Sequence, residues 1–198
     1  MKSVQVRSAF KPLAAATAMA CAALLAAPAQ AQFAERTIRM SNGYLETLFS
    51  LSGKTAVVVG GTGVLGGALA EGLAKSGAFV VVAGRGADRG AARIDSIRAA
   101  GGDGTFVSVD AVDRESVKAL LAAAIHARGR ADILVNCAGV NSSVPYFDIP
   151  DDDFAKVLDT NLTSTHLGCQ IFGAHMAGLG AGAILNIGSV SDRKSTRL

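Results

Sequence analysis

The chain has 198 residues, of which half are hydrophobic and 18% are charged, with 3 cysteines and no tryptophan. This composition excludes intrinsic disorder, which needs low hydrophobicity and high charge, and a fold held together by disulfides. The net charge of +3 comes from Lys2, Arg7 and Lys11, because residues 32–198 contain 16 basic and 16 acidic side chains. A nucleic-acid-binding body needs a basic surplus, so we expect no nucleic-acid partner.

Residues 1–31 have the three-part layout of a secretory signal peptide. Basic and polar residues extend to Lys11, an apolar run of small residues spans Leu13–Ala27, and Ala29-Gln30-Ala31 follows, with cleavage expected after Ala31. The apolar run is shorter than a membrane-spanning helix, which needs about 20 residues. We therefore expect a signal peptide and no membrane segment.

Residues 32–52 are expected to form a linker or N-terminal extension. The stretch from Gln32 to Gly43, together with the signal peptide, resembles the start of a periplasmic solute-binding subunit of the TRAP transporter type. Met40 would also serve as the initiator of the segment that follows, so the export signal and the body need not belong together. Two localisations stay open: periplasmic or secreted with a genuine signal peptide, and cytoplasmic for a body that begins at Met40.

From Gly53 onward, short apolar runs alternate with amphipathic stretches. The five runs are Thr55–Val59, Ala78–Ala83, Thr105–Val109, Asp132–Val135 and Ala183–Ile187. Continuous apolar runs are typical of strands buried on both faces of a parallel sheet. Between two of them, Arg114–Ala127 carries one apolar stripe and has Asp113 in the N-cap position of a helix. This alternation predicts an α/β fold over residues 53–192, a doubly wound parallel sheet (Rossmann fold) of about five strands.

The first predicted strand runs into a glycine-rich turn. Seven residues make this turn: Gly60, Gly61, Thr62, Gly63, Val64, Leu65 and Gly66. Glycines at this spacing let the backbone bend tightly, let a pyrophosphate approach it, and let the following helix, expected from Ala68, pack on the strand. The N-terminus of that helix then offers N–H groups and a positive dipole end to phosphate. We predict that the turn binds a dinucleotide; the alternative is a turn without a ligand.

The residues that follow the second and third predicted strands indicate which dinucleotide. An NAD-binding domain places an acid about 20 residues after the glycine turn, but this sequence has Gly84-Arg85 there. Arg85 can pair with a 2′-phosphate, which favours NADP, with NAD still possible; the alternative is a solvated surface arginine. Asp110, followed by Ala111, comes after the third run, where a carboxylate can accept from the adenine amino group.

Two further motifs follow in chain order. Asn136-Cys137-Ala138-Gly139 comes after the fourth predicted strand, and Asn186-Ile187-Gly188-Ser189 closes the fifth. With the glycine turn, they resemble the motifs of the short-chain dehydrogenases/reductases over Gly53–Asp192, although Val59 and Cys137 depart from the family pattern. The resemblance implies that Asn136, Ala138 and Gly139 lie beside the cofactor and that Ser189 is the catalytic serine.

A polar residue interrupts the apolar stripe of the next predicted helix. The stripe, which we expect to be buried, consists of Phe154, Val157, Leu158, Leu162 and Thr165. Asn161 falls on it, and a buried amide costs about 1–3 kcal/mol unless it is hydrogen-bonded. One alternative is a bond to a neighbouring carbonyl; the family resemblance implies instead that Asn161 holds a water of the catalytic proton relay and that its position kinks the helix.

Other polar residues fit structural roles. His126, His166 and His175 have no second ligand at metal-binding spacing and are expected on helix surfaces. Cys137 and Cys169 form no CxxC motif and are read as reduced thiols. The run Asp151-Asp152-Asp153 suits the first turn of a helix, whose dipole favours acids. We therefore expect no metal site.

The resemblance also requires a Tyr with a Lys four residues later, and this sequence contains none. Its two tyrosines, Tyr44 and Tyr146, are followed four residues later by Leu48 and Pro150. Residues 193–198 have no apolar pattern and resemble a translated sequencing adapter. The expectation is therefore that the sequence comes from a truncated open reading frame and is an inactive fragment of an oxidoreductase.

The parent protein is expected to transfer hydride between NADP and a secondary alcohol or ketone. A sugar acid or polyol is the expected small-molecule substrate class, and a homo-oligomer is the expected assembly. Two other functions stay open. Residues 1–43 would suit an exported, non-catalytic binding protein, and the missing Tyr–Lys pair would suit a nucleotide-sensing module.

Overall fold

A computed structural model of the protein describes residues 42–189. The predicted signal peptide, the TRAP-like stretch as far as Ser41, including Met40, and the terminal residues 193–198 lie outside the described residues. The account below concerns the described part of the chain.

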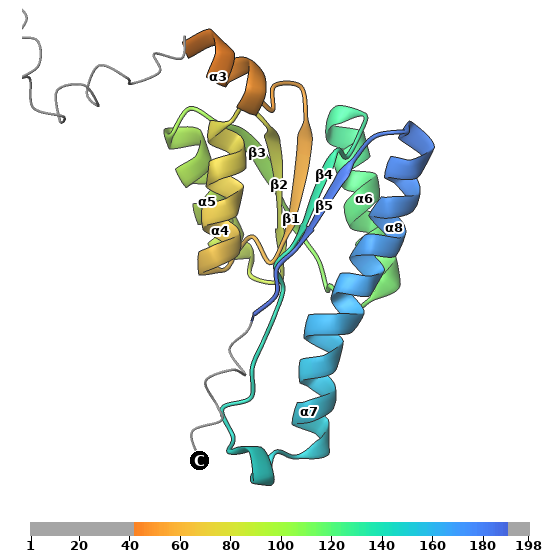
Figure 1. Cartoon of the computed structure of the whole chain (residues 1–198). Helices are drawn as coiled ribbons and strands as arrows, with labels where there is room; N and C mark the ends of the chain where they lie inside the picture. The colour runs from red at the N-terminus through yellow and green to blue at the C-terminus, as the bar shows by residue number, and fades with distance from the viewer. Residues whose placement is uncertain (1–41, 190–198) are drawn as a thin grey trace, which may run out of the picture. The chain divides into compact units, whose positions relative to one another are not determined.

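Within residues 42–189, five parallel strands form one sheet in the order β3-β2-β1-β4-β5 (Figure 1). The strands are β1 (Thr55–Val59), β2 (Phe79–Gly84), β3 (Asp103–Ser108), β4 (Ile133–Asn136) and β5 (Ala183–Asn186). Strands β2 and β3 are added in turn on one side of β1, and β4 and β5 are then added on its other side. The predicted fold class is confirmed, and the reversal between β1 and β4 is where open parallel sheets bind ligands.

Helix α3 (Asn42–Phe49) precedes the first strand. The helices that follow β1 are α4 (Val64–Lys75), α5 (Ala87–Ala99), α6 (Arg114–Arg128), α7 (Asp151–Leu158) and α8 (Ser164–Leu179), with the 3₁₀ turn η1 (Tyr146–Asp148) and the π-helical turn η2 (Asp159–Thr163). Figure 1 shows α4 and α5 against one face and α6 and α8 against the other. Asp113 caps α6 as predicted, since its carboxylate accepts from the backbone N–H groups of Glu115 and Ser116.

The alternation of side chains along the strands divides the core in two. Val57, Val81 and Leu134 pack with α6 and α8, and the largest fully buried side chain of that half is Phe172 of α8. Their strand neighbours Ala56, Val58, Val80, Val82 and Val135 pack with α4 and α5. Both faces of the central strands are apolar because both are covered, which explains the continuous apolar runs in the sequence.

The predicted strands are correct in number and order, but burial on both faces holds only for the centre. The five residues of β1 are all buried, and β2 and β4 are buried except for their first residues. The four residues of β5 are exposed, and β3 is mostly half-buried. The expectation of full burial is therefore wrong for these two edge strands, because each has a neighbouring strand on one side only.

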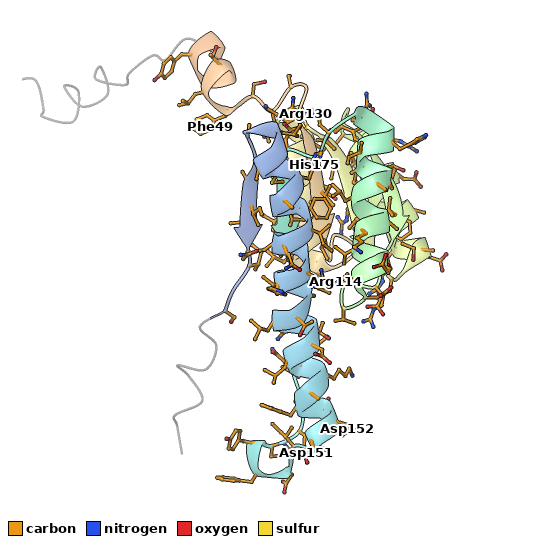
Figure 2. All side chains as sticks on the ribbon, turned by 90° about the vertical axis from the view of Figure 1, so that its right-hand side faces the viewer. Phe49, Arg114, Arg130, Asp151, Asp152 and His175 are labelled. Atoms are coloured by element: carbon orange, nitrogen blue, oxygen red, sulfur yellow. The ribbon has the colours of Figure 1, made fainter. Side chains whose placement is uncertain are left out.

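Helices α7, η2 and α8 follow one another in a single long rod (Figure 1). Figure 2 shows Asp151 and Asp152 at one end of the rod and His175 toward the other. The three aspartates lie in the first turn of α7, as predicted. The predicted burial of the apolar stripe is wrong: Phe154, Leu158 and Leu162 are 56%, 43% and 66% exposed. The spacing is helical, but nothing in the described residues covers this side of α7.

Two of the expected surface histidines are exposed, and one has a structural contact. His126 and His166 are exposed, whereas the Nε2 atom of His175 accepts from the backbone N–H of Ala131 at 3.3 Å. Among the described residues, no group of three or more His, Cys, Asp or Glu side chains could hold a metal ion. No helix in this part of the chain is long and apolar enough to span a membrane.

Candidate functional site

A cavity of about 610 Å³ lies where the strands end at the carboxyl edge of the sheet. Its walls come from the segments that follow β1, β2, β3 and β4 and from the α7–η2 rod. The predicted residues that line it are Gly60, Thr62, Gly63, Arg85, Asp110, Ala111, Ala138 and Gly139. The fold therefore brings together, in one cavity, residues from four separate motifs of the sequence.

The glycine turn is held in a conformation that other residues would disturb. Gly60 has a φ of +83°, and a Cβ atom there would lie 2.6 Å from the carbonyl oxygen of Cys137. The N–H of Gly60 donates to the carbonyl of Ala83, and the N–H of Gly63 donates to the carbonyl of Gly60 at 3.0 Å. Gly60 is thus required both by its left-handed backbone and by the close approach of the segment after β4.

Helix α4 starts at the turn itself, four residues before the predicted start at Ala68. Val64, Leu65 and Gly66 form its first turn, and Gly66 packs so closely on Gly60 that a Cβ atom would overlap its carbonyl. The N-cap residue, Gly63, provides no side-chain hydrogen bond. Val64 is 91% exposed. The N–H groups of the first turn are therefore uncapped at the edge of the cavity, which is the arrangement that binds phosphate.

A further glycine of this region has a role that the spacing analysis missed. A Cβ atom on Gly67 would overlap the guanidinium of Arg93, which reaches from α5 across α4 to pair with Glu71. Ser96 also donates to this carboxylate, at 3.0 Å. The hydrogen bond from Arg93, and then that from Ser96, lower the pKa of Glu71. Gly67 thus leaves room for the ion pair that joins α5 to α4 behind the turn.

The segment after β2 provides two arginines. Gly84, the last residue of β2, faces Thr62 so closely that a Cβ atom would lie 2.7 Å from the threonine Oγ1. Arg85 follows, is exposed and lines the cavity. Arg89, in the first turn of α5, lines the same cavity and was not identified from the sequence. It follows Arg85 by four residues in the sequence, and this spacing was the available signal.

Asp110 lies two residues beyond the end of β3 and lines the cavity with Ala111. Its carboxylate accepts from the backbone N–H of Val112 at 3.2 Å, and its own N–H donates to the Oγ atom of Ser116 at 3.0 Å. These local bonds fix the direction of the loop. The side chain stays exposed, so the carboxylate retains acceptor capacity for a ligand.

Asn136 ends β4 and is 4% exposed. Its Nδ2 atom donates to the Oδ1 atom of Asn186 at 2.8 Å, while its own Oδ1 atom has no partner within the described residues. It does not line the cavity, so the structure places it beneath the site as a sheet residue. The next residue is Cys137, and burial raises the pKa of its thiol. The backbone N–H of Cys137 donates to the carbonyl of Val59.

Asn161 lies in the π-helical turn η2. Its Oδ1 atom accepts from the N–H of Val140 at 2.8 Å, and its Nδ2 atom donates to the Val140 carbonyl at 2.9 Å. The amide of Asn161 thus bonds a neighbouring carbonyl, and its side chain is exposed instead of buried. Neither Asn161 nor Ser189, which lies three residues after β5, belongs to the cavity wall.

The geometry fits a dinucleotide. The turn can approach a pyrophosphate, the uncapped helix can bind its charge, and the cavity lies within the size range of small-molecule sites. The fold and the site thus define a Rossmann-type nucleotide-binding domain. Residues 54–197 match the short chain dehydrogenase family, and the chain belongs to this family.

Curated relatives agree with this assignment. The chain is 34% identical over 157 residues to "Uncharacterized oxidoreductase UxuB" of Bacillus subtilis, covering 72% of this chain and 56% of that protein. It is 40% identical over 139 residues to a 3beta-hydroxysteroid dehydrogenase of Mediterraneibacter gnavus, covering 70% and 50% of the two chains. The chain thus spans about half the length of these relatives.

Solved structures show the same fold. A short-chain type dehydrogenase/reductase from Mycobacterium marinum has a TM-score of 0.73 and 31% identity, covering 77% of this chain and 62% of that one. A metagenomic short-chain oxidoreductase solved in complex with NADP has a TM-score of 0.68 and 31% identity, covering 73% and 66% of the two chains.

Proposed function

We propose that this chain is the nucleotide-binding part of an NADP-preferring short-chain oxidoreductase, with residues 53–192 as its Rossmann domain. The observation that carries the proposal is the convergence of the glycine turn, the uncapped N-terminus of α4 and Arg85 on one cavity. The NADP complex of the metagenomic relative supports the choice of cofactor. NAD remains a second ligand of the same cavity.

Each wall of the cavity would recognise one part of the cofactor. The turn from Gly60 to Gly66 and the first N–H groups of α4 would bind the pyrophosphate. Arg85 would bind the 2′-phosphate, and Asp110 with Ala111 would bind the adenine. Ala138 and Gly139 would line the path between the two halves of the cofactor, and Asn136 would keep the sheet edge in place beneath them.

The bound nicotinamide would supply the hydride chemistry. Ser189 would donate a hydrogen bond to the substrate oxygen, and Asn161 would hold a water in the proton relay while its side chain stays tied to Val140. General acid–base catalysis in this family needs the Tyr–Lys pair, and no Tyr-x-x-x-Lys occurs in these 198 residues. We therefore expect the chain as it stands to bind nucleotide without turning over substrate.

The proposed substrate is a small secondary alcohol or ketone of the sugar-acid or polyol class. A relative from Azotobacter vinelandii, 36% identical over 143 residues, is named L-rhamnose 1-dehydrogenase (NAD(P)(+)), which supports a sugar-like substrate. We place the oxidoreductase body in the cytoplasm, starting at Met40, where reduced nicotinamide cofactors are maintained. The parent enzyme is proposed to form a homo-oligomer.

A charge placed at the helix N-terminus tests the proposal. Gly63 has an extended backbone that any residue adopts, so Gly63→Asp caps α4 and puts a carboxylate where the pyrophosphate should bind. We expect the affinity of the Gly63→Asp variant for NADPH, measured by fluorescence titration, to fall at least 10-fold. Its melting temperature should stay the same or rise. Gly72→Asp adds the same charge on the open side of α4 and should leave binding unchanged. Equal binding by wild type and Gly63→Asp would refute the proposed site.

A further inference from the structure

A second cavity, of about 330 Å³, lies at the amino ends of the strands and shares no residue with the nucleotide cavity. Its walls come from the starts of β1, β2 and β3 and from the ends of α4, α5 and α6. The nucleotide cavity lies at the carboxyl ends of the same strands, so the length of the sheet separates the two. The volume is within the range of small-molecule sites. The proposed function makes no use of this cavity.

The cavity is hollow because a glycine precedes each of three strands. Gly53, Gly77 and Gly101 each stand two residues before the first residue of a strand, with φ angles of +76°, +97° and +82°. The first residues of β1, β2 and β3 are partners in the register of the sheet, so the three glycines occupy equivalent positions on neighbouring strands. A Cβ atom on Gly53 or on Gly101 would meet nothing within 4 Å. Side chains are therefore absent at three aligned positions, and all three glycines line the cavity.

One wall of the cavity is a stacked pair of side chains. The guanidinium carbon of Arg128 lies 4.1 Å from the centre of the Phe79 ring, and both residues line the cavity. The same guanidinium pairs with Asp103, the one acid among the described residues of the lining. Stacking and pairing hold the plane of the Arg128 guanidinium in place. Because this side chain is 46% exposed, its other face can stack on a planar ligand.

Lys54 gives the cavity its excess of positive charge. Its Nζ atom lies 3.5 Å from the carboxylate of Asp132, which also accepts from the N–H of Thr55 at 2.9 Å and pairs with Arg130. Because Asp132 has these closer partners and the Lys54 side chain is 45% exposed, the ammonium group keeps donor capacity for a ligand. The lining arginine is neutralised by its own acid, so the cavity suits an anion.

The helix termini at this edge limit how much negative charge that anion can carry. The last residues of α4 and α6, and the residues directly after α5, line the cavity. The C-terminus of a helix carries a partial negative charge. A dianion would meet three such termini and only one ammonium group without a close acidic partner. A singly charged anion with an apolar, planar body is therefore favoured.

We propose that this cavity is a second ligand site, which binds a planar aromatic monocarboxylate. Lys54 binds the carboxylate, and the aromatic body stacks on the guanidinium of Arg128 in the space that the three glycines leave open. The site does not depend on the proposed nucleotide site, because the two cavities have no residue in common.

Isothermal titration of the full chain with 2-naphthoate and three analogues tests the chemistry of the site. The neutral 2-naphthamide removes the charge, decahydro-2-naphthoate removes the planarity, and 2-naphthyl phosphate adds a second negative charge. We expect 2-naphthoate to bind at least about 3-fold more tightly than each analogue, in line with one lost cation–π or charge contact. A saturating concentration of NADPH should leave the affinity for 2-naphthoate unchanged.

Three variants test the location of the site. Lys54→Gln should weaken 2-naphthoate about 10-fold, in line with the loss of a charge-assisted hydrogen bond, and Arg128→Gln should weaken it at least about 3-fold. Lys118→Gln is the matched control, because it removes an exposed lysine that pairs with Glu115 outside the cavity, and it should leave the affinity unchanged. Circular dichroism melts verify that each variant is folded. The comparison of analogues on wild type stands even where a variant does not fold.

The outcomes that overturn the proposal are distinct from those that overturn the proposed function. Absence of 2-naphthoate binding to wild type, or equal binding by wild type and Lys54→Gln, refutes the second site. Equal or tighter binding of the saturated acid or of the phosphate refutes the assigned ligand class. Displacement of 2-naphthoate by NADPH places the acid in the nucleotide cavity and also refutes the second site. The proposed function stands or falls on NADPH binding alone.

Discussion

Asn136 and Asn186 stand opposite each other on β4 and β5, and the Nδ2 atom of Asn136 donates to the Oδ1 atom of Asn186 at 2.8 Å. This amide pair joins the two strands at their carboxyl ends, three residues before Ser189. Asn136 is buried and Asn186 is exposed, so the exposed side chain on the edge strand β5 provides the hydrogen-bond acceptor for the buried amide of Asn136.

Asn186→Ala should destabilise the protein by about 1–3 kcal/mol, because it leaves a buried amide donor of Asn136 without its oxygen partner. Urea unfolding followed by circular dichroism measures the change. Asn141→Ala, at an exposed loop position, is the control and should stay within about 0.5 kcal/mol of wild type. Equal stability of both variants would show that water replaces the amide pair at no cost.

Two glycines of α8 allow the same substitution with opposite expected results. A Cβ atom on Gly168 would overlap the Oδ1 atom of Asn136, whereas Gly178 has open space around it. Gly168→Ala should therefore cost about 1–3 kcal/mol through overpacking, and Gly178→Ala should gain about 0.5–1 kcal/mol from helix propensity. Thermal unfolding of both variants measures these two stability changes. A stabilising Gly168→Ala would mean that the Asn136 amide moves aside freely.

The loss of folding stability at low pH should depend on Asp132. Burial acts to raise the pKa of this carboxyl group, but the N–H of Thr55 at 2.9 Å, then the ion pair with Arg130 and the charge of Lys54, outweigh burial and lower the pKa. Because the folded pKa lies below the unfolded one, the stabilisation is full above the unfolded pKa, near 4, and is lost as the pH falls through the folded pKa.

Asp132→Asn should thus be less stable than wild type at pH 7, and the difference should shrink below about pH 4. Free energies of unfolding in urea, measured from pH 7 down to pH 2.5, test this. A difference that stays constant over this range would show that the charge of Asp132 contributes nothing to folding.

The close contact between Gly84 and Thr62 constrains a switch of cofactor preference from NADP to NAD. Gly84→Asp with Arg85→Ala would place an acid for the ribose hydroxyls, but the new side chain would meet the Thr62 hydroxyl. Adding Thr62→Gly removes that overlap. We expect the triple variant to prefer NAD over NADP, and the double variant to bind both poorly; titration of NADPH and NADH fluorescence measures both. A double variant that binds NADH well would show that Thr62 moves away.

The features that could be predicted from the sequence are those that depend on a few neighbouring residues. Thr55–Val59 was placed without error because a β-branched run that ends in glycines has few other conformations. Gly60 and Asp113 were identified from the backbone or capping chemistry that their positions require. These features need no knowledge of distant residues.

What the sequence missed depends on neighbours far away in the chain. Helical spacing showed an apolar stripe with Phe154 and Leu162, but spacing cannot show what covers it, and both side chains are exposed. Gly67 is explained only by Arg93, and Gly168 only by Asn136, each from another element. Arg89 joined the site because α5 begins directly at the cavity wall.

The last prediction is that the 198-residue chain binds NADPH but has no dehydrogenase activity. The cavity holds the residues proposed for adenosine and pyrophosphate, so binding should survive. Ser189 can donate a hydrogen bond, but an unperturbed hydroxyl is too weak an acid at neutral pH to replace a tuned phenol, and general acid–base catalysis is worth about 10²–10⁴ in rate. The assay follows NADPH absorbance with the full chain and a panel of ketones and keto acids.

The exposed strand β5, with Ile184 and Leu185 open to solvent, should make the protein prone to association, so the assay needs freshly purified monodisperse material. We expect consumption of NADPH at the rate of the buffer control, with Ser189→Ala behaving identically. Turnover that persists through repurification and is abolished by Ser189→Ala would contradict the prediction, because another residue of this chain would then be moving the proton that the absent tyrosine is expected to transfer.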